Sequence, residues 1–125
     1  HSVRTAKAVL DMVETHLPPS RGRVVLHWFT GSKAEARRAV ELGCYFSVNG
    51  EMFKNDRAGA MVATLPMDRI LTESDGPFTQ VLGRPTRPVD VFVSVELLAR
   101  ARGIDPYVAA SQIRANLGRL LSEDL

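Results

Sequence analysis

Short apolar segments alternate with amphipathic segments along this chain of 125 residues, and that alternation limits the possible folds more than any other feature. The apolar segments have the length and composition of buried strands, and they are Val24–His27, Cys44–Val48 and Ile70–Glu73. Apolar residues at helical spacing predict helices at 4–16, 32–42, 57–65, 90–102 and from 106 onward. Strands that alternate with helices indicate parallel βαβ units, so the sequence predicts an α/β fold.

The predicted helix ends carry residues that commonly form such ends. Ser32 and Glu35 have the spacing of a capping box, and Gly43 follows the second helix in the usual C-terminal position. Asp90 is expected to be the N-cap of the fourth helix. The stretch from Gly76 to Pro88 is rich in glycine, proline and arginine, and we predict a long loop there.

Three strands cannot close a barrel or bury both of their faces. A (β/α)8 barrel needs about 250 residues, roughly twice the length of this chain. The chain also begins at His1 without a methionine, and a helical pattern follows at once. The sequence therefore predicts one partial domain over residues 1–125, and we expect the chain to be a piece of a longer protein.

The composition is that of an ordinary globular protein, with 45% hydrophobic and 24% charged residues. The net charge of +2 is too small to indicate nucleic-acid binding by itself, although 13 of the 16 basic residues are arginines. The single cysteine, Cys44, excludes an intramolecular disulfide, which fits a reducing compartment. No apolar run approaches the roughly 20 residues of a membrane span, so we expect a cytoplasmic protein.

Residues with metal-binding side chains follow the predicted strands. His27 ends the first strand, and Asp75 comes directly after the third. A predicted helix begins shortly after His1, so His1 has the position expected at the end of an earlier strand. Parallel barrel strands end on one face, where active sites are built, and imidazole and carboxylate groups bind zinc, manganese and related ions. The three residues could therefore meet at one divalent ion.

Each of these residues also has a simpler interpretation. A histidine at a strand end is often structural, and an aspartate before Gly-Pro is often a turn residue. Glu73 could be a solvated carboxylate or a partner of the site, and His16 fits a helix end, where its charge complements the dipole. Physical chemistry alone makes a metal site plausible without establishing one.

Two segments resemble the motifs of TatD-family deoxyribonucleases. Leu26–Ser32, with the sequence LHWFTGS, is similar to the family's His-Cys-Phe-Thr-Gly segment. Thr72–Pro77, with the sequence TESDGP, is similar to its Glu-Thr-Asp-x-Pro segment. These motifs are the strongest part of the resemblance because they contain the residues that could carry chemistry.

The resemblance extends over essentially the whole chain. Glu41–Ser47 resembles the family's Leu-Gly-x-Tyr strand, and Arg87–Val91 resembles a proline segment that leads into a helix. Asn116–Leu121 resembles the terminal Asn-x-x-Arg-Leu-Phe. His1–Ala6 resembles a His-x-Arg-x-Ala element with one additional residue before the arginine.

The resemblance implies the C-terminal half of a (β/α)8 TIM barrel of the metal-dependent hydrolase type, which cleaves phosphodiester bonds in DNA. It implies a divalent metal ion (Mg, Mn or Zn) held by His1, His27 and Asp75. Asp75 would also be the catalytic carboxylate that activates the attacking water, and Glu73 would support the site. Candidates for holding substrate phosphate are Arg4, Thr30 and Gly31.

The chain departs from the family pattern in several places. Trp28 replaces a common cysteine, which predicts either core packing or a surface for base stacking, and Gly76 before the proline is expected to change little. The family's His-x-His pair and its metal-bridging glutamate do not occur in this chain, so we expect the isolated chain to be inactive or nearly so. The variants around His27 and Asp75 are most similar to TatD-like proteins of Qat anti-phage operons, which implies operon-encoded partners.

Two other functions remain open from the sequence. One is a non-catalytic subunit that associates with itself or a partner through exposed sheet edges. The other is an amidohydrolase-type enzyme acting on a small amide or ester. Arg84 and Arg87, in the loop after Asp75, slightly favour nucleic acid because arginines suit phosphate contacts.

Overall fold

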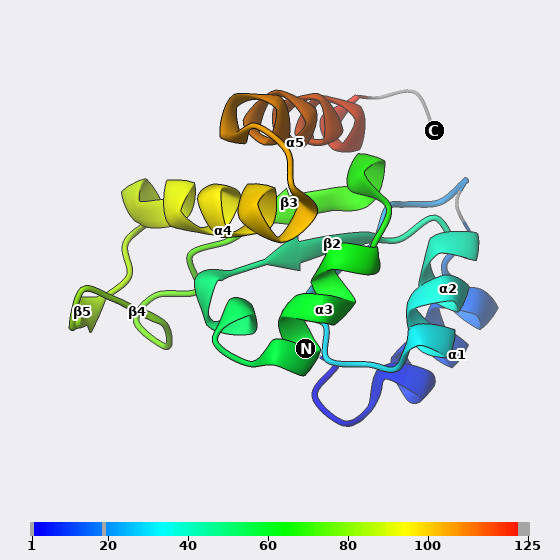
Figure 1. The fold of residues 1–125 in the computed structure, drawn as a ribbon. Helices are drawn as coiled ribbons and strands as arrows, with labels where there is room; N and C mark the ends of the chain where they lie inside the picture. The colour runs from blue at the N-terminus through cyan, green and yellow to red at the C-terminus, as the bar shows by residue number, and fades with distance from the viewer. Residues whose placement is uncertain (1, 19, 123–125) are drawn as a thin grey trace.

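Three parallel strands form the centre of the fold, and helices follow each of them (Figure 1). The computed structural model describes residues 2–18 and 20–122. The strands of the main sheet are β1 (Val25–His27), β2 (Tyr45–Val48) and β3 (Ile70–Thr72). The α-helices are α1 (Ala6–His16), α2 (Lys33–Glu41), α3 (Asp56–Thr64), α4 (Phe92–Arg102) and α5 (Pro106–Leu121). The predicted α/β alternation is therefore confirmed.

The strands lie side by side in chain order, β1-β2-β3, as consecutive strands of a (β/α)8 barrel do. His27 pairs with Ser47, and Val48 pairs with Thr72, so the three strands end at the same edge of the sheet. Within the described residues, β1 and β3 each pair with β2 alone. This topology is that of a partial barrel with both lateral edges open.

Apolar side chains between the sheet and the helices form the core. Phe46, Val48 and Ile70 from the strands are fully buried, as are Leu10 of α1 and Leu98 of α4. Burial of this apolar surface is the main favourable term in folding, at about 25 cal/mol per Å². The core thus fixes the helices against the sheet.

Polar contacts between residues far apart in the sequence join α1 to α2 and α5 to the sheet. Arg38 of α2 donates to Asp11 Oδ1 of α1 at 2.6 Å and also to Glu14. Asn116 of α5 is fully buried and donates to the carbonyls of Met67 (2.8 Å) and Ile70 (2.7 Å) at the start of β3. Asn116 therefore ties the last helix to the strand that leads into the candidate site.

The predicted capping box at the start of α2 is confirmed. The Ser32 hydroxyl accepts from the Glu35 backbone N–H, and the Glu35 carboxylate accepts from the Ser32 N–H at 2.7 Å. Gly43 follows the helix with a φ of 76°, a left-handed conformation that glycine adopts at little cost. Local sequence chemistry thus determines both ends of α2.

The prediction of an irregular loop over Gly76–Pro88 was wrong in part. A short antiparallel hairpin forms there from β4 (Gln80–Val81) and β5 (Arg84–Pro85), and it projects beyond the ends of the main strands (Figure 1). Strands of two residues carry too little hydrophobic alternation to be recognised in a sequence. The hairpin lies in the segment that directly follows Asp75.

The prediction that Asp90 caps α4 was also wrong. Asp90 lies within a 3-10 turn, Pro88–Val91, and α4 begins at Phe92 without a side-chain cap. Its carboxylate accepts two hydrogen bonds from the Arg84 guanidinium, at 2.7 and 2.8 Å, and one from the Arg87 N–H at 2.8 Å. Asp90 therefore fastens the hairpin to the start of α4.

Candidate active site

Side chains from two strand ends meet at the carboxyl edge of the sheet. His27 ends β1, and its Nε2 lies 3.6 Å from Oδ1 of Asp75, which follows β3. The His27 side chain is 26% exposed and that of Asp75 is 19% exposed, so both are largely buried but still accessible to solvent. The structure thus brings these two of the expected site residues together at the strand ends.

The separation of the two atoms suits shared ligation of one ion. Nitrogen and oxygen ligands lie about 2.0–2.2 Å from zinc, which places neighbouring ligands roughly 3–3.5 Å apart. The 3.6 Å between His27 Nε2 and Asp75 Oδ1 is close to that spacing. The donor chemistry of this pair therefore fits a divalent metal ion.

Glu73 orients His27 from the other side of the ring. Its Oε2 lies 2.6 Å from Nδ1 of His27, and its side chain is 15% exposed. With the proton on Nδ1 donated to Glu73, the lone pair of Nε2 is directed to the side where Asp75 lies. A carboxylate that holds a histidine in this manner is common beside metal ions.

Glu73 is itself held by two polar residues, Ser47 of β2 and Asn49 directly after it. The Ser47 hydroxyl donates to Oε2, and Asn49 Nδ2 donates to Oε1 at 2.9 Å. Ser47 is 7% exposed and Asn49 is fully buried. Sequence reasoning missed these two residues, although polar residues two apart in an otherwise apolar strand are a signal that could have found them.

The backbone takes unusual conformations next to both candidate ligands. Trp28 and Asp75 have φ values of 44° and 48°, in the left-handed region. Aspartate tolerates this region better than most residues, whereas for a bulky side chain such as tryptophan it is rare and costs about 1–3 kcal/mol. Such strain collects at functional sites, and here it turns the chain sharply after His27.

Trp28 packs against the hydrophobic core and is partly buried. Its ring lies edge-on to that of His27, with centroids 6.4 Å apart. Of the two expectations for this residue, core packing is the one that the structure supports.

Gly76 was expected to be of little consequence, and that expectation was wrong. A Cβ at this position would lie 1.7 Å from the carbonyl oxygen of Thr86. Only glycine allows the backbone after Asp75 to approach Thr86, the residue directly after β5, so closely. The residue therefore determines how the segment after Asp75 returns toward the sheet.

The expected phosphate ligands differ in their surroundings. Arg4 and Thr30 are exposed, and Arg4 has a φ of 56° just before α1. Gly31 lies under the Phe29 ring, and a Cβ there would be 2.4 Å from Phe29 Cζ. Gly31 thus has a packing role that does not depend on substrate. His1, the remaining expected metal ligand, lies outside the described residues.

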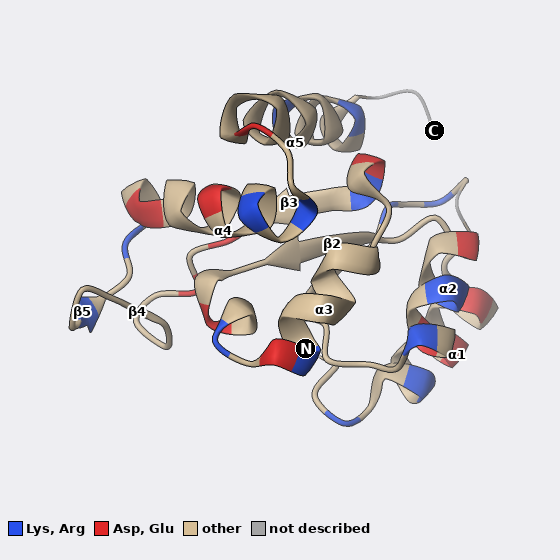
Figure 2. Cartoon of the chain, viewed as in Figure 1, with Lys and Arg blue, Asp and Glu red and all other residues tan. Residues whose placement is uncertain are grey.

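Arg84 does not have the role that the sequence suggested. Both of its terminal nitrogens bind Asp90, so its guanidinium belongs to the structural contact that fastens the hairpin. Arg87 remains more open, with a side chain that is 65% exposed. Along the ribbon in Figure 2, basic and acidic positions are interspersed on α1, α2 and α4.

Within residues 2–18 and 20–122, no group of three or more histidine, cysteine, aspartate or glutamate side chains is arranged to hold a metal ion. Among these residues, His27 and Asp75 are the two candidate ligands that the structure brings together. None of its helices has the length and apolar character required to cross a membrane.

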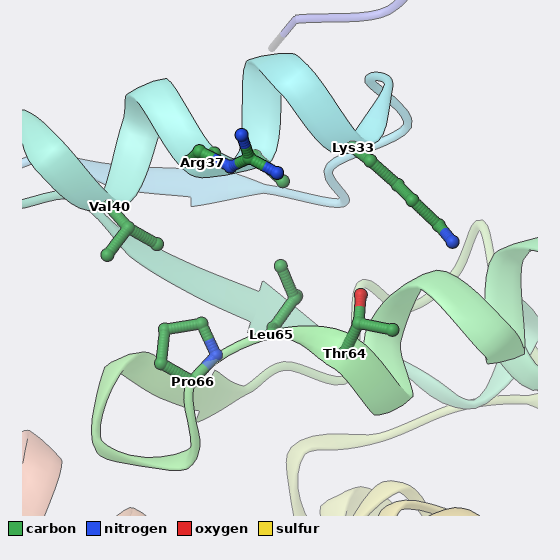
Figure 3. Close-up of a pocket in the computed structure, with 7 residues that line it drawn as sticks. Lys33, Arg37, Val40, Thr64, Leu65 and Pro66 are labelled. Atoms are coloured by element: carbon green, nitrogen blue, oxygen red, sulfur yellow. The ribbon is translucent and has the colours of Figure 1, made fainter.

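A groove of about 310 Å³ lies elsewhere, between α2 and α3 (Figure 3). Lys33 and Arg37 border it on α2, while Leu65 and Pro66 line it after α3. His27, Glu73 and Asp75 take no part in it. The groove is therefore separate from the candidate site.

A parallel sheet with ligand-type side chains at its carboxyl edge is found in (β/α)8-barrel enzymes. Residues 1–122 match the family model for TatD related DNase, so the chain belongs to that family. The resemblance in the sequence motifs is thereby confirmed.

Individual relatives agree with this assignment. "Deoxyribonuclease Tat-D" of Schizosaccharomyces pombe is 33% identical over 97 residues, which are 78% of this chain and 30% of that protein. "3'-5' ssDNA/RNA exonuclease TatD" of Cronobacter sakazakii is 31% identical over 124 residues, covering 90% of this chain and 45% of that protein. The chain thus spans less than half the length of these relatives.

Solved structures confirm the fold. YJJV, a TatD homologue from Escherichia coli K12, superposes with a TM-score of 0.79 at 27% identity, covering 94% of this chain and 46% of that one. A TatD-family hydrolase from Entamoeba histolytica gives 0.77 at 14% identity, with 92% and 47% covered, and supports the fold alone. The predicted half of a TIM-barrel hydrolase is consistent with both.

Proposed function

We propose that residues 1–125 provide the C-terminal half of the active site of a metal-dependent hydrolase that cleaves phosphodiester bonds in DNA. The observation that carries this proposal is the 3.6 Å approach of His27 Nε2 and Asp75 Oδ1 at the strand ends, with Glu73 on the opposite ring nitrogen. The names of relatives, a deoxyribonuclease and a ssDNA/RNA exonuclease, support phosphodiesters as the substrate class.

His27 and Asp75 would hold the ion, with His1 as a third ligand. A divalent ion (Mg²⁺, Mn²⁺ or Zn²⁺) supplies charge stabilisation at a phosphoryl oxygen and makes a bound water more acidic. Relatives named metal-dependent hydrolases support this requirement.

The protein side chains have distinct tasks in this proposal. Asp75 accepts the proton of the attacking water through its carboxylate. Glu73 retains the proton of His27 on Nδ1, which leaves Nε2 available for ligation. Arg4, the Thr30 hydroxyl and the backbone N–H of Gly31 would bind phosphate oxygens of the substrate.

The isolated chain is expected to have little or no activity. The described residues contribute a ligand pair and no cluster of three, and a hydrolytic site needs further groups. The complete set would be assembled only in a full-length polypeptide that carries this chain.

The biological setting forms a finer part of the proposal. We place the protein in the cytoplasm, in an anti-phage system of the Qat type with operon-encoded partners. The basis is the pair of sequence variants His27-Trp28-Phe29 and Asp75-Gly76-Pro77-Phe78. Reconstitution of the operon with and without Asp75→Asn would test it, because phage resistance should be lost with the variant.

A non-catalytic subunit is the second candidate. The open edges of β1 and β3 in the described sheet favour it, because unpaired strand edges recruit other strands. A stable complex with a partner, formed without any hydrolysis, would support this alternative.

The decisive experiment measures cleavage of a labelled single-stranded oligonucleotide with Mg²⁺ or Mn²⁺. A full-length polypeptide should cleave the strand, Asp75→Asn should lower the rate by about 10²–10⁴-fold, and residues 1–125 alone should show no turnover. Asp68→Asn is the matched control, because Asp68 is an exposed aspartate outside the site. Equal rates for Asp75→Asn and the unmodified protein would refute the assignment, and faster hydrolysis of a small ester would favour an amidohydrolase.

A further inference from the structure

The turn after Asp75 presents an aromatic ring to solvent. Phe78 is 80% exposed and lies three residues after Asp75. Its backbone N–H donates to the Asp75 carbonyl at 3.0 Å, which closes a four-residue turn. Such a turn keeps its first and last Cα atoms less than about 7 Å apart. The backbone of Phe78 is therefore held within one turn of Asp75.

The backbone around Phe78 is anchored on both sides. The Thr79 hydroxyl donates to the Ser74 carbonyl, and Thr79 is only 2% exposed. The Gln80 N–H donates to Glu51 Oε1 at 3.1 Å, and the Thr86 N–H donates to the Thr79 carbonyl at 3.0 Å. Phe78 is thus exposed at a fixed point and not at the end of a loose loop.

The exposed ring of Phe78 contributes little to the stability of the fold. An apolar ring left in water forgoes the free energy that its burial would contribute, and here the neighbouring Thr79 is buried while the ring is not. A binding partner with a flat apolar face would recover that free energy. Beside a site for phosphodiester cleavage, the group with this shape is a nucleobase, and base stacking on aromatic rings is how proteins commonly hold single strands.

We propose that Phe78 is the stacking platform for the base next to the scissile phosphate, and that it directs the site to unpaired strands. This inference rests on the proposed function. A base inside a duplex is stacked on both of its faces and cannot offer one to the ring. Phe78 thereby acts as a specificity-determining residue, separate from the groups that bind the ion or move the proton.

Binding measurements with the metal chelated test the platform without requiring turnover. Fluorescence anisotropy would compare a labelled single-stranded oligonucleotide with an abasic strand that has the same phosphates, using the full-length polypeptide. Phe78→Ala should weaken binding of the base-bearing strand by about 5- to 150-fold and leave the abasic strand unaffected. Phe78→Trp should retain binding, and Tyr107→Ala, which removes an equally exposed ring from α5, should change neither affinity.

Two results would overturn the inference. One is equal weakening of the base-bearing and abasic strands by Phe78→Ala, which would mean that the ring positions the loop. The other is a clear drop in melting temperature, which would mean that the ring is packed in the full-length polypeptide. The proposed function is tested separately. If Phe78→Ala weakens binding but the unmodified protein hydrolyses nothing, the nuclease is refuted. If the unmodified protein hydrolyses the strand and Phe78→Ala binds it equally well, the platform alone is refuted.

Discussion

His27 and Glu73 are joined by a hydrogen bond of 2.6 Å between Nδ1 of the imidazole and Oε2 of the carboxylate. Glu73 in turn receives hydrogen bonds from Ser47 and Asn49. The ring orientation of His27 therefore depends on residues at or directly after the ends of β2 and β3. This network is the physical basis of the first prediction.

Glu73→Gln should weaken metal binding by about 10- to 100-fold, because the neutral amide no longer fixes the proton on Nδ1 of His27. Isothermal titration of a full-length polypeptide with Mn²⁺ or Zn²⁺ measures the change. Glu41→Gln, at an exposed position at the end of α2, is the control and should leave the affinity unchanged. Identical affinities for both variants would show that Glu73 does not tune the histidine.

Gly76→Ala should destabilise the protein by about 1–3 kcal/mol, because its Cβ would collide with the Thr86 carbonyl oxygen. Gly118→Ala is the matched control, since nothing lies within 4 Å of its added Cβ in α5. That substitution should stabilise the protein by up to about 1 kcal/mol through helix propensity. Urea unfolding of both variants measures the two effects, and the same sign for both would contradict the structure.

Asn116→Leu should lower the free energy of unfolding by about 1–3 kcal/mol, because the buried carbonyls of Met67 and Ile70 lose their donor. The urea midpoint should fall with the slope unchanged. Gln112→Ala removes only a hydrogen bond to Asn116 Oδ1 and should have a smaller effect. Similar losses in the two variants would argue against Asn116 as the main tie between α5 and β3.

Asp90 should make stability depend on pH in the acid range. Hydrogen bonds from the Arg84 guanidinium and then the Arg87 N–H hold the pKa of its carboxyl well below the usual 3.8. Between the folded-state and the unfolded-state pKa of Asp90, the folded protein therefore binds fewer protons than the unfolded chain. The resulting stabilisation is fully present above the unfolded-state pKa, at about pH 4. It is lost as the pH falls below that point.

Asp90→Asn should remove this component of the acid response. Unfolding curves at a series of pH values from 7 down to 2 should show a steeper loss for the unmodified protein than for the variant. Asp68→Asn, at an exposed position, should keep the steep response. Parallel curves for Asp90→Asn and the unmodified protein would contradict the effect of Arg84 on Asp90.

The main strands and helices could be predicted because their signals are local. The run Val24–His27 is apolar and short, and Ser32 with Glu35 carries its own cap, so few other conformations suit these segments. His27 and Asp75 could be paired because parallel strands end on one face. These predictions needed no knowledge of distant contacts.

The predictions that failed depend on contacts between distant or irregular segments. Asp90 has the sequence position of an N-cap, but its carboxylate binds Arg84 six residues earlier. The turn of the hairpin uses Leu82 with a φ of 50°, a conformation that its sequence does not signal. The roles of Ser47 and Asn49 become evident only when Glu73 is brought to the neighbouring strand.

The network around Glu73 has a consequence for the fidelity of folding. His27 of β1 pairs with Ser47 of β2, and Glu73 directly follows β3. A slip of one residue in β2 would turn Ser47 to the opposite face of the sheet. A misregistered chain would leave the Glu73 carboxylate without its donor from Ser47. Natural selection for a functional site would thus also select for accurate strand pairing, because the contact between Ser47 and Glu73 requires the native register of β2.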